Sequence, residues 1–485
     1  MSRGLFQGRT FDDFLFRPRL GRVGSRADAR LGSRFSKGIA LELPVVSANM
    51  DSVTGSAMAR TMALEGGIGI VHRALSIEDQ AREVERVKRS HGWIVEDPIR
   101  LPRTATLREA RDTIRRHGVT GLLIEESRGS GVLAGILSKR DMPWDPGREG
   151  DPVERHMTPF DRLHVGRPGM SPDEAARILY EHRIEKLPVV DAERRIAGLI
   201  TKSDILLSRE RPDSTKDAKG RLRVGAAVGA RGDYLDRADA LLAAGADALV
   251  VDIAHGHSEV MAEALGALRA RFPKAELVAG NVGTAEGALF LKDLGVAAVK
   301  VGIGPGRGCR TRLETAAGVP QLEAIYEIRL ALGESVPIIA DGGMRHDKDI
   351  VLALLCGASS VMLGSMLSGT DEAPGRVIED PATHEKRKVY RGMTSPQAVL
   401  ATHYGAGEEE ELERALETPA EGQELEVPYR GSVRDVLHRL RGHLRSAVSY
   451  AGETSLGSAR EVLLDDPEAF LVPLSAASIR ESYER

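Results

Sequence analysis

Cysteine and aromatic residues are scarce in this chain, which has two cysteines and 4% aromatic residues among 485. Two cysteines cannot form a disulfide framework, so we expect a reducing, cytoplasmic environment. Long hydrophobic runs are absent too, and the N-terminal MSRGLFQGRTFDDFLF predicts neither a signal segment nor a membrane span. The net charge of -4 argues against nucleic acid or an acidic membrane as the main partner. These absences exclude classes of protein without naming a function.

Eight short apolar runs recur along the chain, and most of them end in residues suited to chemistry. They span residues 43–47, 68–71, 223–228, 248–251, 276–279, 298–301, 337–340 and 360–363. Segments with apolar residues at helical spacing, such as 234–243, 259–271 and 285–294, lie between most of them. Continuous apolar strands alternating with helices indicate a parallel sheet, and eight such units predict an α/β fold, the (β/α)8 TIM barrel. The loops after the strands would then meet at one mouth.

An internal repeat interrupts this spacing between the second and third runs. The segment AGILSKRDM at 134–142 recurs as AGLITKSDI at 197–205. Two copies of this length predict a paired module inserted into a barrel loop. The repeat resembles a tandem of CBS domains, which places four residues at ribose-contact positions: Ser138, Asp141, Thr201 and Asp204. The alternative is an insert with a structural role only.

The repeat also sets the expected domain boundaries. The barrel domain would occupy residues 1–92 and 209–485, and the tandem module residues 93–208, divided into about 93–150 and 151–208. After the eighth run, the chain from 376 to 426 is too long for an ordinary barrel connection. We expect a flap at about 394–426, whose charged stretch GAGEEEELERALE is either a solvated surface or part of a lid over the mouth.

One of the two cysteines lies in the glycine-rich stretch VGIGPGRGCRTR at 301–312. Glycines allow the backbone to approach a ligand closely, and the flanking arginines would favour a thiolate at Cys309. A reactive cysteine on a loop after a barrel strand is a candidate nucleophile, whereas a small buried residue in a tight turn is the alternative. Local sequence leaves both open. Cys356, in the apolar ALLCGASSV, fits the buried alternative.

The seventh and eighth runs are followed by a second kind of signal. Asp341-Gly342-Gly343 and Gly364-Ser365 stand where barrels commonly bind phosphate through backbone N–H groups. A carboxylate such as Asp341 can accept hydrogen bonds from both hydroxyls of a ribose. Together these loops indicate a site for a nucleoside monophosphate.

The motifs together resemble the family of inosine-5′-monophosphate (IMP) dehydrogenases and guanosine-5′-monophosphate (GMP) reductases. The cysteine loop is similar to that family's GIGPGSICTTR, and VVDIAHGHS, AGNVGT, IADGG, GASSVMLGSMLSGTDEAPG and VYRGM all have counterparts. The resemblance extends from Thr10 to Ser482. It implies NAD-dependent oxidation of IMP to xanthosine monophosphate (XMP), with GMP reduction by NADPH as the alternative. A catalytically silent nucleotide sensor using only the CBS pair is a third reading.

The same resemblance implies roles for single residues. Cys309 would add to C2 of the purine, beside Thr311 and Glu421. Substrate would contact Met50, Asp341, Gly342, Gly343, Gly364, Ser365, Tyr390, Arg391, Gly392, Met393 and Glu421. NAD would contact Asp252, Gly302, Ile303 and Gly304. A K⁺ ion would bind the carbonyls of Gly304, Gly306 and Cys309, completed by Glu481, Ser482 and Tyr483 of a neighbouring subunit.

Three positions depart from the family pattern. Arg307 stands where the family has serine, which alters the phosphate contact, and Arg310 replaces a threonine. Dehydrogenases carry an arginine–tyrosine pair on the flap to activate water, and here His403-Tyr404 is the nearest pair. Histidine titrates near neutral pH, so His403 is a candidate base, with Thr311 and Glu421 as the alternative.

The choice between dehydrogenase and reductase rests on opposing features. ANMDSV and DIAHGHSE lean towards reductases, whereas the flap length, the CBS pair and the ending IRESYER favour a dehydrogenase. We expect the dehydrogenase. The resemblance further implies a homotetramer or an octamer, with adenine or guanine nucleotides as effectors of the CBS module.

Overall fold

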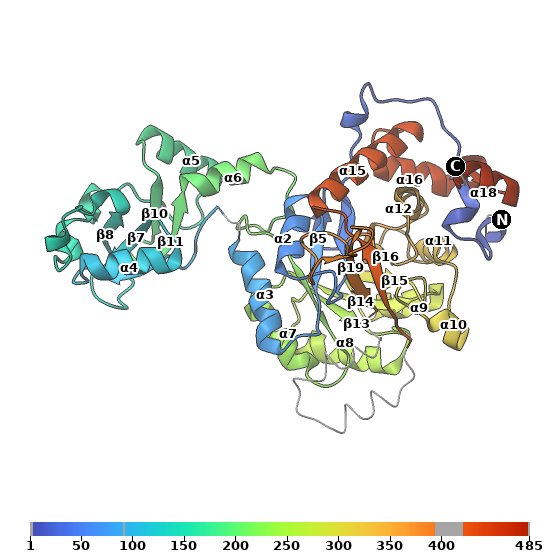
Figure 1. Ribbon diagram of the computed structural model, residues 1–485, viewed down its shortest axis with the longest axis horizontal. Helices are drawn as coiled ribbons and strands as arrows, with labels where there is room; N and C mark the ends of the chain where they lie inside the picture. Colours follow the sequence, from blue (N-terminus) through green and yellow to red (C-terminus); the bar gives the residue numbers. More distant parts are fainter. Residues whose placement is uncertain (1–2, 91–92, 393–420, 484–485) are drawn as a thin grey trace. The chain divides into compact units, whose positions relative to one another are not determined.

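The computed structural model describes residues 3–90, 93–392 and 421–483. The chain forms two compact units (Figure 1). Unit 1 consists of Met1–Ser90, Asp213–Lys216 and Leu222–Arg485, and unit 2 consists of His91–Pro212 and Asp217–Arg221.

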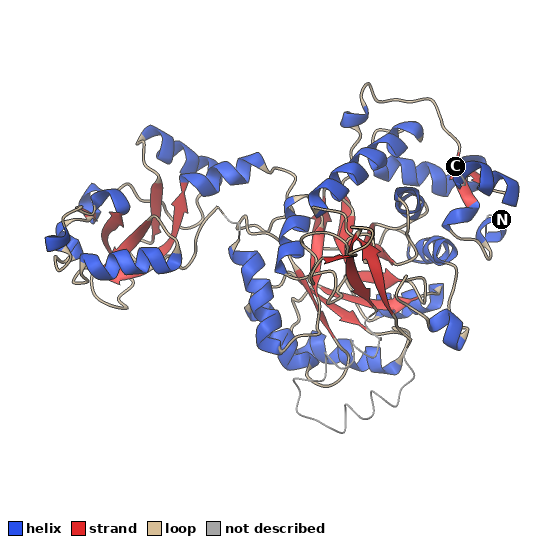
Figure 2. Ribbon diagram, in the orientation of Figure 1, coloured by secondary structure: helices blue, strands red, loops and turns tan. Residues whose placement is uncertain are grey.

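Unit 1 is built around a closed barrel of parallel strands, seen as the red arrows of the larger body in Figure 2. In barrel order the strands are β4 (Val45–Ser47), β5 (Ile68–Val71), β12 (Gly225–Val228), β13 (Ala248–Asp252), β14 (Leu277–Val282), β15 (Ala298–Val301), β16 (Ile338–Asp341) and β17 (Ser360–Leu363). β17 pairs with β4 and closes the barrel. Each predicted apolar run overlaps one of these strands, so the predicted (β/α)8 barrel is confirmed.

Helices surround these strands and cover the apolar barrel. They are α2 (Ser56–Leu64), α3 (Ile77–Arg89), α7 (Tyr234–Ala243), α8 (Glu259–Arg271), α9 (Ala285–Asp293), α11 (Gln321–Leu332), α12 (Asp347–Leu355) and α15 (Val433–Tyr450). Ser258 and Thr284 cap α8 and α9 by accepting from backbone N–H groups, which explains where these helices begin. None of the described helices has the length and apolar character needed to cross a membrane.

A small antiparallel sheet stands beside the barrel. It contains β18 (Ile378–Glu379), β19 (Lys386–Arg391) and β20 (Glu424–Pro428), with β19 in the centre. The residues before β20 run along the cysteine loop, because Gln423 N–H donates to the Gly308 carbonyl at 3.0 Å and Arg310 N–H to the Glu421 carbonyl at 2.7 Å. Most of the predicted flap lies outside the described residues.

Shorter elements complete unit 1. They are α1 (Arg3–Phe6), β1 (Phe14–Phe16), β2 (Ser33–Ser36), β3 (Ile39–Leu41), α10 (Thr311–Thr315), α16 (Leu456–Asp465), α17 (Pro467–Phe470), β21 (Leu471–Pro473) and α18 (Ala476–Tyr483). β1 pairs with β21, which ties the two ends of the described chain together.

Unit 2 has two similar halves. The first contains β6 (Arg100–Pro102), α4 (Leu107–His117), β7 (Gly121–Glu125), β8 (Leu133–Ser138) and β9 (Thr158–Pro159); the second contains α5 (Pro172–Glu181), β10 (Lys186–Val190), β11 (Ile196–Thr201) and α6 (Lys202–Glu210). In each half a helix precedes an antiparallel strand pair. Ser138 donates to Asp141 at 2.7 Å, and Thr201 donates to Asp204 at 2.6 Å, at equivalent points of the two copies.

Candidate active site

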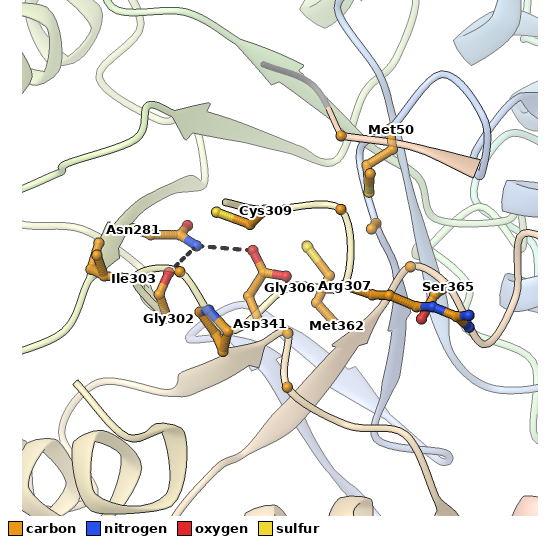
Figure 3. A pocket seen from close by; sticks show the side chains of 18 of the residues that line it. Met50, Asn281, Gly302, Ile303, Gly306, Arg307, Cys309, Asp341, Met362 and Ser365 are labelled. Carbon is orange, nitrogen blue, oxygen red and sulfur yellow. Dashed lines mark hydrogen bonds between the residues drawn. The ribbon is translucent and has the colours of Figure 1, made fainter. Parts of the chain in front are cut away.

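A cavity of about 530 Å³ lies at the carboxyl ends of the barrel strands (Figure 3). Residues at the carboxyl ends of β4, β13, β14, β15, β16 and β17, or in the loops that follow these strands, line it together with Tyr390, Gly392 and Glu421. Parallel barrel strands all present their carboxyl ends at one face, so residues far apart in sequence meet there.

The cysteine loop begins where β15 ends and follows the cavity wall closely. Gly302 has a φ of 149°, and a Cβ atom there would lie 2.1 Å from the Asp341 carbonyl oxygen. A side chain at this position would therefore collide with backbone, so only glycine fits. The glycine-rich sequence is explained by this close approach of the loop to the end of β16.

The Cys309 thiol is linked through a hydroxyl to a carboxylate. Its Sγ lies 3.1 Å from the Thr311 Oγ1, and the Thr311 hydroxyl donates to Glu421 Oε2 at 2.5 Å. Cys309 is half-buried, so a ligand in the cavity can reach it. The three side chains form a continuous hydrogen-bonded path along which a proton can move.

The arginines near Cys309 are engaged in different ways. Arg310 Nε donates to Glu314 at 2.8 Å, and Arg312 Nε donates to the Ile303 carbonyl at 3.1 Å. Burial lowers the pKa of Arg312, and the charge of a Cys309 thiolate opposes that shift, which places the guanidinium within electrostatic reach of the sulfur. Arg307 is exposed and lines the cavity.

Cys356 offers a contrast to Cys309. It caps the end of α12 with no exposed surface, and burial raises the pKa of its thiol. A neutral, inaccessible thiol is neither nucleophile nor metal ligand.

Most of the residues predicted to bind the substrate line the cavity. Asp341, Gly342, Gly343, Gly364 and Ser365 all line it, as do Met50, Tyr390 and Gly392. The Tyr390 hydroxyl donates to Met50 Sδ at 3.6 Å. Burial, with the Asp341 charge, raises the pKa of Tyr390, whereas the positive charge of Arg307 opposes this. A neutral phenol, a guanidinium and glycine N–H groups are together suited to a phosphate.

The predicted cofactor residues line the same cavity. Asp252 ends β13, and Gly302, Ile303 and Gly304 follow β15. Asn49 Nδ2 donates to Asp252 Oδ2 at 2.7 Å, which fixes the carboxylate at the cavity wall. Gly306, predicted for the cation, also lies in this loop.

Several predicted site residues lie elsewhere. Arg391 Nε donates to Asp51 at 2.6 Å, and its side chain does not line the cavity formed by the described residues. Glu481 and Ser482 belong to α18, where the Ser482 hydroxyl donates to the Ser478 carbonyl at 2.8 Å. Tyr483 ends the same helix. Three predicted residues lie outside the described ranges: Met393, His403 and Tyr404.

Sequence reasoning gave no role to Lys300 and none to Asn281. Lys300 is buried on β15 and contacts both Asp252 and Asp341, and Asn281 Nδ2 donates to Asp341 Oδ2 at 3.0 Å (Figure 3 shows the latter bond). A lysine inside the apolar run AVKV was the available signal, because charged residues are rarely buried without a partner.

These features define a barrel protein with a thiol, a hydroxyl and a carboxylate at the mouth of a nucleotide-sized cavity. Residues 8–484 match the family described as the IMP dehydrogenase / GMP reductase domain. An inosine-5′-monophosphate dehydrogenase from Nitrosopumilus maritimus is 43% identical over 98% of both chains, and one from Aquifex aeolicus is 42% identical over 100% of this chain and 96% of its own.

Solved structures are similar as well. A cysteine-to-alanine variant of GMP reductase from Trypanosoma brucei, in complex with guanosine 5′-monophosphate, superposes with a TM-score of 0.86 at 38% identity, covering 98% of this chain and 97% of that one. The same reductase in complex with guanosine 5′-triphosphate gives a TM-score of 0.77 at 34% identity, covering 98% and 100%. The chain belongs to the IMP dehydrogenase / GMP reductase family, as the sequence motifs predicted.

Proposed function

We propose that this chain oxidises IMP to XMP with NAD, through a covalent bond between Cys309 and the purine. The observation that carries the proposal is the contiguous set of Cys309, Thr311 and Glu421 at the mouth of the cavity. Relatives named IMP dehydrogenase match nearly the whole chain, which supports the direction of the reaction.

In the first half of the reaction, the Cys309 sulfur attacks C2 of the purine. The proton of the thiol leaves towards Thr311 Oγ1, which lies 3.1 Å away and is itself bonded to Glu421. Asp341 would hold the ribose, and the loops around Gly343 and Gly364 would hold the phosphate, so that C2 stands opposite the sulfur. Arg307 adds a guanidinium to the phosphate end, where the family has a serine.

Bound NAD would supply the acceptor for the hydride that leaves C2. The residues proposed to hold it, Asp252, Gly302, Ile303 and Gly304, line the same cavity as Cys309. The Asp252 carboxylate would accept hydrogen bonds from ribose hydroxyls. Loss of hydride leaves a thioimidate between Cys309 and the oxidised purine.

In the second half, water attacks the thioimidate and Cys309 leaves as a thiol, which gives XMP. The attacking water must lose a proton, and Thr311 Oγ1 is placed to accept it because its own hydrogen is directed at Glu421. The overall reaction converts IMP, NAD⁺ and water into XMP, NADH and one proton.

Direct assay separates this function from its alternatives. Purified protein with IMP and NAD should form NADH, measured by the absorbance of the reduced nicotinamide, and should not consume NADPH with GMP. The reductase is the second candidate, because GMP reductases from Trypanosoma brucei superpose closely. If the protein consumes NADPH with GMP and forms no NADH with IMP, it is a reductase and the proposed function is wrong. Inactivity in both mixtures would favour a nucleotide sensor.

A K⁺ requirement is a further part of the proposal. The carbonyls of Gly304 and Cys309 accept no hydrogen bond from the described residues, whereas the Gly306 carbonyl accepts from Cys309 N–H at 3.0 Å. Free carbonyls of this kind suit a K⁺ ion. Glu481, Ser482 and Tyr483 of a neighbouring subunit would complete the site in a homotetramer or octamer.

Exchanging K⁺ for Na⁺ or Li⁺ should therefore lower the steady-state rate, because a smaller ion cannot hold the cysteine loop in the same conformation. Deleting residues 481–485 should lower it in the same way and should remove the difference between salts. Equal turnover in the three chloride salts would contradict the cation site.

Unit 2 is proposed to bind adenine or guanine nucleotides and to regulate the barrel. A solved relative in complex with guanosine 5′-triphosphate supports a triphosphate as the effector, and the paired Ser138–Asp141 and Thr201–Asp204 contacts mark equivalent positions in the two halves.

Replacing about residues 93–207 with a short Gly/Ser linker should leave turnover largely intact, because all the residues proposed for catalysis belong to unit 1. The shortened protein should lose any change in rate on addition of ATP or GTP, which the full chain should show. A folded but inactive shortened protein would count against this role.

We also propose a cytoplasmic location for the protein. Both cysteines are free thiols, and Cys309 must stay reduced to act as a nucleophile.

A further inference from the structure

Lys300 is a buried charge at the centre of the barrel mouth. Its side chain is 2% exposed, and its Nζ lies 2.7 Å from Asp252 Oδ1 and 2.7 Å from Asp341 Oδ2. The neighbouring strand leaves room for it, because a Cβ at Gly280 would lie 2.7 Å from the Lys300 Cβ. One ammonium group therefore joins the ends of two strands, β13 and β16.

Lys300 and Asp252 hold each other in the ionised state. Burial alone would lower the pKa of Lys300, but Asp252 and Asp341 outweigh it and the pKa is raised. Burial would likewise raise the pKa of Asp252, but the charge of Lys300 outweighs it and the pKa is lowered. An isolated ammonium or carboxylate in this position would be costly, so each group depends on the others.

Amide groups complete the arrangement on both sides. Asn49 donates to the second oxygen of Asp252 at 2.7 Å, and Asn281 donates to Asp341 Oδ2 at 3.0 Å. Asp341 Oδ1 accepts no hydrogen bond from the described residues, so it remains available to a ligand in the cavity. The carboxylates are thus fixed in direction as well as in charge.

We propose that Lys300 is a positioning residue shared by two ribose sites, one for the substrate at Asp341 and one for the cofactor at Asp252. The inference rests on the proposed function, which assigns those two carboxylates to IMP and NAD. Ribose hydroxyls donate hydrogen bonds and need ionised, correctly turned carboxylates. A single ammonium supplies both conditions at both sites.

Without the ammonium, the partly buried carboxylates of Asp252 and Asp341 have no positive charge between them. Two like charges held close together repel, and one of the pair takes up a proton or turns away. The other charged or titratable groups facing them are Arg73, whose charge favours ionised Asp252, and Tyr390, which lies near Asp341. Neither contacts both carboxylates in the way that Lys300 does.

The test measures binding rather than turnover. In a Cys309→Ser background, the dissociation constants of IMP and of NAD are measured separately by calorimetry, with Lys300 and with Lys300→Met. Loss of a buried charge partner should weaken both ligands by at least about tenfold. Lys300→Gln, which keeps a hydrogen-bond donor but no charge, should weaken both as well.

A pH series separates positioning from general destabilisation. In the Lys300 protein Asp252 stays ionised, whereas in Lys300→Met burial would raise the carboxyl pKa. The ionised form, and with it ligand binding, is then present at high pH and is lost as pH falls. The ratio of dissociation constants, that of Lys300→Met divided by that of the Lys300 protein, should therefore increase for both ligands as the pH falls from about 8 to about 5.5. Taking the ratio removes the titration of the IMP phosphate itself.

Lys88→Met is the matched control. Lys88 is also buried and pairs with Asp247 at 2.9 Å, but it lies on α3 and does not line the cavity. This variant should lower the melting temperature and leave both affinities unchanged.

The outcomes are distinct. If the Cys309→Ser protein with Lys300 binds neither IMP nor NAD, the proposed function itself is wrong. If it binds both, and folded Lys300→Met or Lys300→Gln binds both equally well at every pH, the shared positioning role is overturned. Weakening of only one ligand would overturn it too, because the role would then belong to one site.

Discussion

Replacing Cys309 by serine should abolish NADH formation while IMP still binds. Loss of a covalent nucleophile can cost on the order of 10⁶ in kcat, so turnover should fall below detection. Binding should persist because the groups that would hold ribose and phosphate, Asp341 and the glycine loops, are unchanged. Steady-state absorbance measures the first result and calorimetry with IMP the second.

Cys356→Ser is the control for this experiment. It makes the same chemical change in a thiol that is fully buried at the end of α12. Activity should be retained, and stability should fall by about 1 kcal/mol, because a hydroxyl replaces a sulfur in an apolar site. Substantial turnover by Cys309→Ser would show that Cys309 is not the nucleophile.

Replacing Thr311 by valine should separate the two halves of the reaction. The variant keeps the shape of the side chain and loses the hydroxyl that links Cys309 to Glu421. If this path removes the proton from the attacking water, the first turnover should still give a burst of NADH, and the steady-state rate should fall by about 10²-fold or more. Glu421→Gln should behave in the same way. Rapid-mixing absorbance resolves the burst from the steady state.

Thr315→Val is the matched control, since its hydroxyl is exposed on the same short helix and bonds backbone groups: it donates to the Thr311 carbonyl at 2.7 Å and accepts from the Ala317 N–H at 3.1 Å. It should leave both phases unchanged. Loss of the burst in Thr311→Val would place the path in the first half of the reaction instead.

His403 provides the competing explanation for hydrolysis. If it is the base, His403→Ala should keep the burst and then stall, and the steady-state rate of the unsubstituted protein should fall as pH drops through about 6.5. A normal steady state in His403→Ala, together with a stalled Thr311→Val, would assign the role to Thr311 and Glu421.

The barrel could be predicted from local sequence, because its strands are buried on both faces and each is a continuous apolar run. β15 and β16 both follow this rule, and each ends at a loop that the sequence marked with glycine or aspartate. The residues after the strands therefore met at the mouth as predicted. Backbone pattern and strand direction are enough for that inference.

Contacts between distant side chains could not be predicted in the same way. Glu421 meets Thr311 only because the segment before β20 runs along the cysteine loop, and family resemblance rather than local pattern suggested the pair. Lys300 was missed because its two partners end other strands, and Arg391 pairs with Asp51 instead of entering the cavity. Such pairings depend on tertiary geometry that no short sequence window contains.

Covalent catalysis by Cys309 can be tested by locating the adduct on the protein. The protein is mixed with IMP and NAD, quenched in acid during turnover, digested and analysed by mass spectrometry. We expect the mass of the oxidised purine nucleotide on the peptide that carries Cys309 and none on the peptide that carries Cys356. Active protein with no adduct on Cys309, or with the nucleotide on another residue, would contradict it.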